Sequence, residues 1–118
     1  MRTISKTLIL SGVLMMALFA AGCPERRSIG DIEANPSRFA GKTVGVAGRV
    51  TTSYGIPLVG GVYKIEDGTG SLWVLTERGV PQKGARVGVK GTIENGITFG
   101  GRNYGLGMIE EDRRFAKK

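Results

Sequence analysis

The chain has 118 residues, which is enough for one small domain rather than two. It contains one cysteine and no histidine, which excludes an intrachain disulfide and removes both the commonest general base and the commonest metal ligand. The net charge of +7, from 17 basic and 10 acidic residues, favours anionic neighbours and says nothing about the fold.

The first 22 residues have the layout of a secretory signal peptide. Arg2 and Lys6 give a positive start, residues 8–21 carry no charge, and small residues follow. A membrane-spanning helix is the alternative, but 14 residues at about 1.5 Å each reach roughly 21 Å, short of the roughly 30 Å hydrocarbon core. Removal of this signal would leave 96 residues with a net charge of +5.

The run Ala20-Ala21-Gly22-Cys23 resembles the lipobox of bacterial lipoproteins. The resemblance implies that residues 1–22 are removed, that Cys23 carries lipid, and that residues 23–28 tether the protein to a cell membrane facing the periplasm. Pro24 stands in place of aspartate, which implies the outer membrane where a cell has two membranes. A buried structural thiol is the other interpretation, but residues 24–27 give Cys23 no core to enter.

A short helix is predicted over residues 29–34, covering one end of the domain that follows. Ser28 and Asp31 have the spacing of an N-cap and an acidic residue three positions later. Pro36 ends the helix, because the residue before a proline is pushed out of the helical region. The apolar residues expected to face the domain are Ile29, Ile32 and Phe39.

After Gly41 the sequence predicts only strands and turns, which places the chain in the all-β class. The predicted strands are residues 43–53, 62–66, 71–76, 85–94 and 104–110. Alternation puts Val44, Val46 and Val50 on the inner face of the first strand. In the fourth strand it puts Val87, Val89 and Ile93 inward.

The second and third strands flank Asp67-Gly68-Thr69-Gly70, a strong hairpin signal. Asp67 is expected to close this turn through its own side chain. With the turn centred on Gly68-Thr69, Ile65 lies opposite Leu72 and Tyr63 opposite Val74, all pointing inward. Lys64 then faces Trp73 on the outer surface.

Two strands repeat the pattern G-x-x-V-G-V-x-G-x-[VI], beginning at Gly41 and Gly84. The glycine within each strand lets it coil sharply, as the closure of a small barrel requires. Two copies around a single hairpin argue against a solenoid. Five strands, of which the first and fourth are bent at glycine, predict an OB-fold, a five-stranded Greek-key barrel with a short N-terminal helix.

The sequence also resembles known OB-fold families. The matching runs are V-x-V-x-G-x-V at 44–50, Y-x-I-x-D-G-T-G-x-L-x-V at 63–74, P-x-x-G at 81–84 and V-x-V-x-G-x-I at 87–93. They are similar to the tRNA-anticodon/helicase type and to the periplasmic bacterial OB-fold family, over residues 41–110. Residues 77–83 are predicted to form a loop where many OB-folds have a helix. The predicted domain spans residues 29–112, followed by a basic tail at 113–118.

Catalytic chemistry has little support in the sequence. The acidic runs Glu66-Asp67 and Glu110-Glu111-Asp112 lack the spacing of metal ligands or paired catalytic carboxylates. The glycine-rich run at 100–105 lacks the lysine-serine ending and the following helix of a phosphate-binding loop. We therefore expect a protein that is not an enzyme and that uses no metal or cofactor.

OB-folds bind ligands on the surface of their second and third strands and in the adjoining loops. Here that surface carries Trp73 and Lys64, and a lysine over an indole ring contributes about 0.5–1 kcal/mol when exposed. The adjoining loops are residues 52–61 and 95–103. The candidate ligand-binding residues are Trp73, Lys64, Arg49, Tyr54, Ile56, Leu58, Phe99, Arg102 and Lys90.

Two functions compete for this surface. The first is recognition of a protein or an anionic component of the cell envelope, through aromatic and apolar anchors with a basic rim. The second is single-stranded nucleic-acid binding, with bases stacked on Trp73 and Tyr54 and phosphates held by cations. A lipid-anchored protein outside the cytoplasm rarely meets nucleic acid, so the first is preferred. In the structural alternative, Trp73 packs beneath the N-terminal helix and the cations only solvate the barrel.

Overall fold

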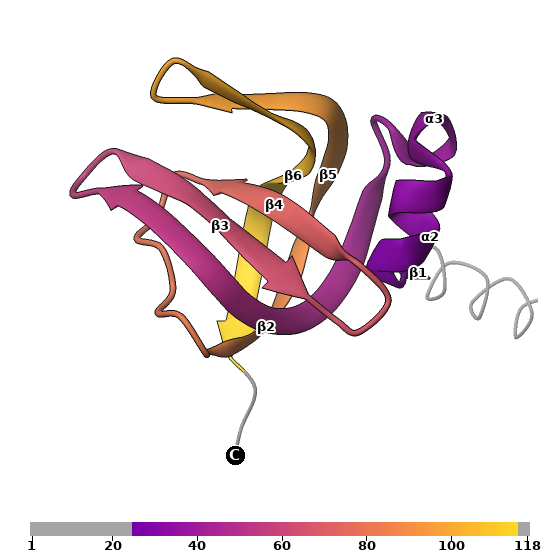
Figure 1. Ribbon diagram of the computed structural model, residues 1–118, viewed down its shortest axis with the longest axis horizontal. Helices are drawn as coiled ribbons and strands as arrows, with labels where there is room; N and C mark the ends of the chain where they lie inside the picture. Colours follow the sequence, from indigo (N-terminus) through magenta and orange to yellow (C-terminus); the bar gives the residue numbers. More distant parts are fainter. Residues whose placement is uncertain (1–24, 116–118) are drawn as a thin grey trace, which may run out of the picture.

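The computed structural model describes residues 25–115; the predicted signal segment, Cys23 and residues 116–118 lie outside the described residues. The elements are β1 (Glu25–Arg26), α2 (Ile29–Ala34), α3 (Pro36–Phe39), β2 (Thr43–Ile56), β3 (Gly60–Glu66), β4 (Ser71–Thr76), β5 (Arg86–Phe99) and β6 (Arg102–Phe115). Figure 1 shows the long strands wound around one another, with both helices together at one end.

Five strands close into a barrel because β2 pairs with two partners. Its first half is antiparallel to β5 and its second half is antiparallel to β3, and Arg49 is paired with both. β3 and β4 form an antiparallel hairpin, β4 is parallel to β6, and β6 is antiparallel to β5. The order β2-β3-β4-β6-β5, closed by the β2–β5 pairing, is the predicted Greek-key OB-fold.

The strands extend further than the sequence indicated. β5 and β6 form one long hairpin, in which residues 113–115, expected in the basic tail, pair with residues 87–89. β1, expected in the tether, pairs in parallel with the start of β2. Both extensions add backbone to a strand edge. The free N–H and C=O groups of such an edge form hydrogen bonds with another strand whatever side chains that strand carries.

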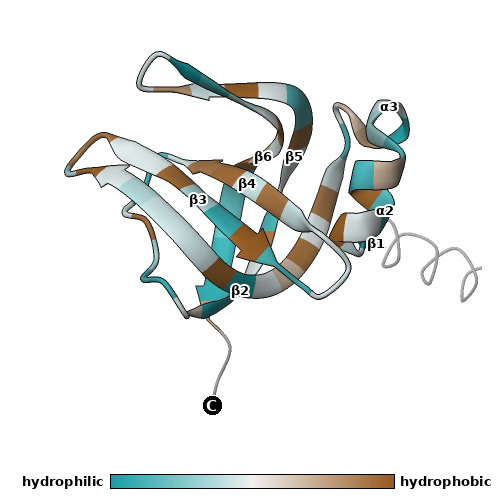
Figure 2. Ribbon diagram, viewed as in Figure 1, coloured by the Kyte–Doolittle hydropathy of each residue, from teal (hydrophilic) through white to brown (hydrophobic). Residues whose placement is uncertain are grey.

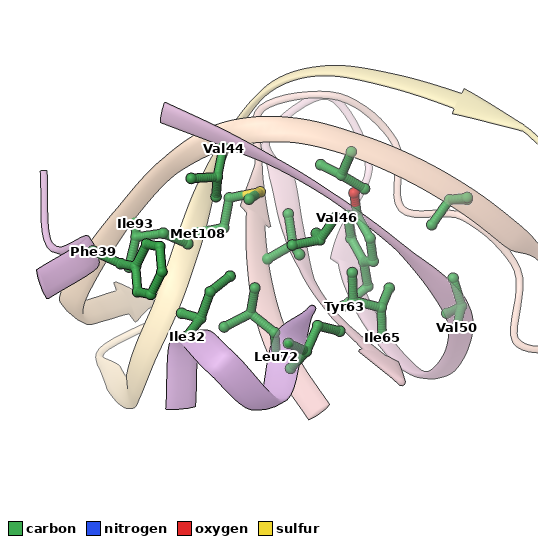
Figure 3. Packing of buried hydrophobic residues seen from close by; sticks show 14 residues of the cluster. Ile32, Phe39, Val44, Val46, Val50, Tyr63, Ile65, Leu72, Ile93 and Met108 are labelled. Atoms are coloured by element: carbon green, nitrogen blue, oxygen red, sulfur yellow. The ribbon is translucent and has the colours of Figure 1, made fainter. Parts of the chain in front are cut away.

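The predicted helix forms over α2, and Ser28 Oγ caps it by accepting a hydrogen bond from the Asp31 N–H at 3.2 Å. Pro36 ends α2 and also begins α3, because its fixed φ suits the first turn of a helix. The buried apolar residues of the two helices are Ile29, Ile32 and Phe39. They belong to the same core cluster as the inner faces of the strands, so the helices cover one end of the barrel (Figure 3).

The two repeated strands lie side by side and form the seam between β2 and β5. Val46 is opposite Val89 at its centre, while Val44 is opposite Gly91 and Gly48 is opposite Val87. The first valine of each copy therefore faces the mid-strand glycine of the other copy. The valines predicted to point inward are all buried.

Gly48 and Gly91 allow the close backbone approach that closes the barrel. A Cβ at Gly48 would lie 2.5 Å from the Glu66 carbonyl oxygen, and one at Gly91 would lie 2.6 Å from Met108 Cγ. No side chain fits at such distances unless the neighbouring strand moves. The glycines in the repeated pattern are therefore required by the approach of β3 and β6.

One acidic residue, Glu110, is buried inside a hydrogen-bonded network, with its side chain 1% exposed. Its carboxylate accepts hydrogen bonds from the Tyr63 hydroxyl at 2.5 Å, the Thr76 hydroxyl at 2.6 Å and Arg113 Nη1 at 3.3 Å. Burial, together with the neighbouring carboxylate, raises the pKa of Tyr63 well above its usual range. The network links β3, β4 and β6 and leaves none of these polar groups without a partner.

The β3–β4 turn also holds α2 in place. Asp67 Oδ1 accepts hydrogen bonds from the N–H groups of Thr69 at 2.9 Å and Gly70 at 3.2 Å, which confirms the predicted turn closure. Its Oδ2 accepts the N–H of Ile29, at the start of α2, at 2.9 Å. Partial burial acts to raise the pKa of Asp67, but these hydrogen bonds outweigh it and lower the pKa below the usual value.

Replacing Gly48 by alanine should destabilise the barrel by roughly 1–3 kcal/mol, because the new methyl group forces β2 away from the Glu66 backbone. Gly88→Ala is the matched control: a Cβ there meets no atom within 4 Å, so its effect should stay within about 0.5 kcal/mol. Urea denaturation of the two variants measures both. Equal stability of the two variants would contradict the close approach at the seam.

The lowered pKa of Asp67 predicts a loss of stability in acid. The contribution of its carboxylate is fully present above its unfolded pKa of about 4 and disappears as the pH falls through the lower folded pKa. Asp67→Asn should therefore be less stable than the parent at pH 7, and the difference should shrink below about pH 4. Chemical denaturation at a series of pH values measures it, and a difference that stays constant down to pH 2 would argue against this role.

Candidate functional site

Three aromatic rings form a row across the outer surface of the barrel. The rings of Tyr54 in β2 and Trp73 in β4 are stacked, with centroids 6.2 Å apart and planes 19° apart. Tyr104 in β6 lies on the other side of Trp73, with centroids 4.8 Å apart and planes 54° apart. We call these three residues the aromatic row.

Two cations lie over the rings of this row. Lys64 is directly opposite Trp73 in the β3–β4 register, as predicted, and its Nζ is 5.7 Å from the ring centroid of Trp73. Arg102 Cζ is 5.2 Å from the ring centroid of Tyr104. Each such contact contributes about 0.5–1 kcal/mol at an exposed site. The row is therefore aromatic along its length and positively charged beside two of its rings.

Strand alternation and one bulge bring these side chains to the same face. Trp73 points outward because its neighbours Leu72 and Val74 are buried in the core. In β2, simple alternation from the buried Val50 would turn Tyr54 inward. The β2–β3 register shifts between Val50 and Thr52, and this bulge reverses the alternation, so that Tyr54 lies on the outer face.

The row rests on a small apolar layer of its own. Val62 and Ile97 are buried, although neither belongs to the core cluster inside the barrel. Val62 is opposite Tyr54 in the register. Ile97 fills the space beside Gly107, which is opposite Trp73: a Cβ at Gly107 would lie 2.6 Å from Ile97 Cδ1. The rings are thus supported from below by fixed side chains.

The tip of the β2–β3 hairpin, beyond Tyr54, is an exposed apolar segment. Ile56 is 50% exposed, Val59 is 60% exposed and Leu58 is fully exposed (Figure 2). Leu58 has a φ of +67°, in the left-handed region that favours glycine and costs a residue with a Cβ about 1–2 kcal/mol. We call residues 56–59 the apolar tip.

The structure brings most of the predicted site residues together. Trp73, Lys64, Tyr54 and Arg102 belong to the aromatic row or contact it, and Ile56 and Leu58 form the adjoining tip. Phe99 is half-buried and lies opposite Arg102 in the β5–β6 hairpin. Trp73 does not pack beneath the helices; Leu72, on the opposite face of β4, contributes to the core that they cover (Figure 3).

Arg49 and Lys90 lie in a different place from the one predicted. They line a separate groove of about 980 Å³ between β2, β5 and β6, and no residue of the aromatic row lines it. They lie on the first half of β2 and on its partner β5, whereas Tyr54 lies on the second half of β2, which coils round the barrel to pair with β3. Sequence alternation assigns a residue to the inner or the outer face and could not predict this coiling.

Three contributors to the face were missed by the sequence analysis: Tyr104, Val62 and Ile97. Glycines around Tyr104 hid the alternation of the β5–β6 hairpin. Tyr104 lies two residues after Arg102 and therefore on the same face of the strand, and this spacing could have identified it.

Within residues 25–115 no group of three acidic or thiol side chains could hold a metal ion. None of the helices in this range has the length and apolar character needed to cross a membrane.

No family model matches the sequence, and no curated protein matches it. Among solved structures, it is similar to an OBody, AM3L09, bound to hen egg-white lysozyme, with 21% identity, a TM-score of 0.53, and coverage of 69% of this chain and 87% of the OBody. It is also similar to a putative aspartyl-tRNA synthetase from Leishmania major Friedlin, with 13% identity, a TM-score of 0.60 and coverage of 80% of this chain.

A third similar structure is asparaginyl-tRNA synthetase from Pyrococcus horikoshii, with 20% identity, a TM-score of 0.53 and coverage of 66% of this chain. The chain spans only about a fifth of either synthetase, 21% and 20% respectively. At these identities the likeness shows the fold alone. The barrel is an OB-fold.

Proposed function

We propose that this protein is a lipid-anchored OB-fold binding module whose aromatic row and apolar tip recognise a protein of the bacterial cell envelope. The lipobox resemblance at Cys23 supports the anchor and the periplasmic location. The aromatic row with its exposed apolar tip carries the binding proposal. No catalytic role is assigned to any residue.

The composition of the face favours a protein ligand. Aromatic side chains held on a fixed support are the anchors that interface centres use. Ile56, Leu58 and Val59 extend this surface without charge, and exposed apolar clusters mark interaction sites. The OBody, which has a similar fold, is an OB-fold bound to a protein, lysozyme. The positive φ of Leu58 is a conformational cost that a ligand contact at the tip would offset.

Single-stranded nucleic acid is the second candidate, and one observation favours it. The stacked rings of Tyr54 and Trp73 with Lys64 beside them resemble a base-stacking platform next to a phosphate contact. Two of the structural neighbours are named as tRNA synthetases. The apolar tip argues against this candidate, because it offers no cation along the path of a nucleic-acid backbone.

The decisive experiment places a photo-crosslinking amino acid at Leu58 in cells producing the full chain. We expect covalent adducts with an envelope protein, and Trp73→Ala should lower their yield at least about thirtyfold if Trp73 is an interface anchor worth about 2 kcal/mol. Phe115→Ala removes a more exposed aromatic side chain, 60% exposed and outside the face, and should leave the yield unchanged. Adducts that survive Trp73→Ala would show that the row is not the binding surface.

Two further measurements separate the alternatives. Oligonucleotide binding that is strong at low salt and falls steeply as salt rises would favour the nucleic-acid candidate; we expect none. Cys23→Ser should abolish fatty-acid labelling, and retained label would overturn the anchor.

A further inference from the structure

The groove lined by Arg49 and Lys90 has a floor of small residues and basic walls. Its floor comprises Gly45 and Ala47 from β2 and Gly88 from β5, which lie together in the β2–β5 register. A Cβ at Gly88 would meet no atom within 4 Å, so the floor is open above the backbone. The cations that line the groove are Arg26, Arg49, Arg86, Lys90 and Arg114.

The acidic residues of the groove do not neutralise these arginines. Asp67 is engaged by the β3–β4 turn and by α2. Asp112 pairs with Arg78 at 3.7 Å. Glu66 is opposite Arg49 in the register, yet within residues 25–115 no ion pair joins Arg49, Arg86 or Arg114 to any carboxylate. Lys90, by contrast, lies 4.0 Å from Glu111.

Arg49 and Arg86 are directly opposite each other across the seam. Like charges at opposed positions of a β-ladder repel and destabilise the pair. At the other end of the same seam Thr43 is opposite Thr92, and their hydroxyl oxygens are 3.4 Å apart. The two strands can therefore pair through neutral residues, so the pairing itself does not require two opposed arginines. Glu66, opposite Arg49 on β3, offsets part of this repulsion, and an anion across the two arginine side chains would remove the rest.

We propose that this groove docks onto the phosphate-bearing headgroups of an anionic membrane. The choice of a membrane as the source of the anion rests on the proposed lipid anchor. Cys23 is three residues before Arg26, and three residues of chain span at most about 11 Å. A lipid on Cys23 thus holds the groove about one Debye length from the headgroups, where basic residues are attracted to an anionic surface.

Docking through this groove leaves the binding face free. No residue of the aromatic row or the apolar tip lines the groove, so both surfaces can be occupied at once. The membrane then orients the barrel and presents its aromatic row to a partner.

The test uses the full chain reconstituted in phosphatidylcholine vesicles, with or without phosphatidylglycerol. Phenylglyoxal modifies accessible arginines, and mass spectrometry reports each position. We expect Arg49, Arg86 and Arg114 to react about fivefold more slowly in the anionic vesicles, the factor that corresponds to about 1 kcal/mol per basic residue at such a surface. High salt should remove this protection. Arg38, which lies outside the groove, should react equally in both.

Two variants make the result specific. Arg49→Gln/Arg86→Gln should abolish the protection of Arg114, whereas Arg38→Gln/Lys83→Gln removes the same charge elsewhere and should preserve it. Thermal unfolding verifies that both pairs of variants fold.

Equal reactivity in the two kinds of vesicle would overturn the proposal. Protection by inorganic phosphate alone in phosphatidylcholine vesicles would also overturn it, by showing a site for a small anion. Failure of the anchor is seen separately, as fatty-acid labelling that persists in Cys23→Ser. Failure of the partner-binding face is seen as crosslinking that is unaffected by Trp73→Ala.

Discussion

The pairing of β2 with β5 closes the barrel, and the remaining features take their positions from it. This seam requires Val46 and Val89 to meet on the inside while Gly48 and Gly91 admit the neighbouring strands. Because one strand must pair with β5 along its first half and β3 along its second, β2 coils sharply and carries a bulge after Val50. Closure of a five-stranded sheet is the constraint, and the glycines and the bulge are how this sequence satisfies it.

The same bend gives the protein two surfaces of different chemistry. Residues 45–49 of β2, before the bulge, line the basic groove, and Tyr54, after it, belongs to the aromatic row. The buried Glu110 network ties together β3, β4 and β6, and those strands carry Lys64, Trp73 and Tyr104. A fixed support of this kind lowers the conformational entropy lost on binding, which suits a surface that recognises its ligand without rearrangement.

Features governed by local sequence could be predicted, and features governed by distant contacts could not. The Asp67 turn fixed the β3–β4 register, including Lys64 opposite Trp73, because a tight hairpin determines its own pairing. Ser28 and Pro36 marked the ends of α2 for equally local reasons. The bulge near Thr52 depends on how β2 meets two other strands.

The same distinction explains what was missed at the site. Tyr104 joins the row because β6 is parallel to β4, a pairing between segments about thirty residues apart. In the sequence Glu110 is one of three consecutive acidic residues, and only the fold reveals that it is enclosed by Tyr63, Thr76 and Arg113. Arg49 and Lys90 were predicted to flank the surface that carries Trp73, but the coiling of β2 places them at the other surface.

If the proposed function is correct, a partner covers the aromatic row in the cell. Oxidative footprinting in intact cells, compared with the purified protein, tests this directly because Trp73 is the only tryptophan. We expect Trp73 and Tyr54 to be oxidised several-fold more slowly in cells, with the exposed residues of α2 and α3, which lie away from the row, as references that do not change. Equal oxidation of Trp73 in cells and in the purified protein would contradict it.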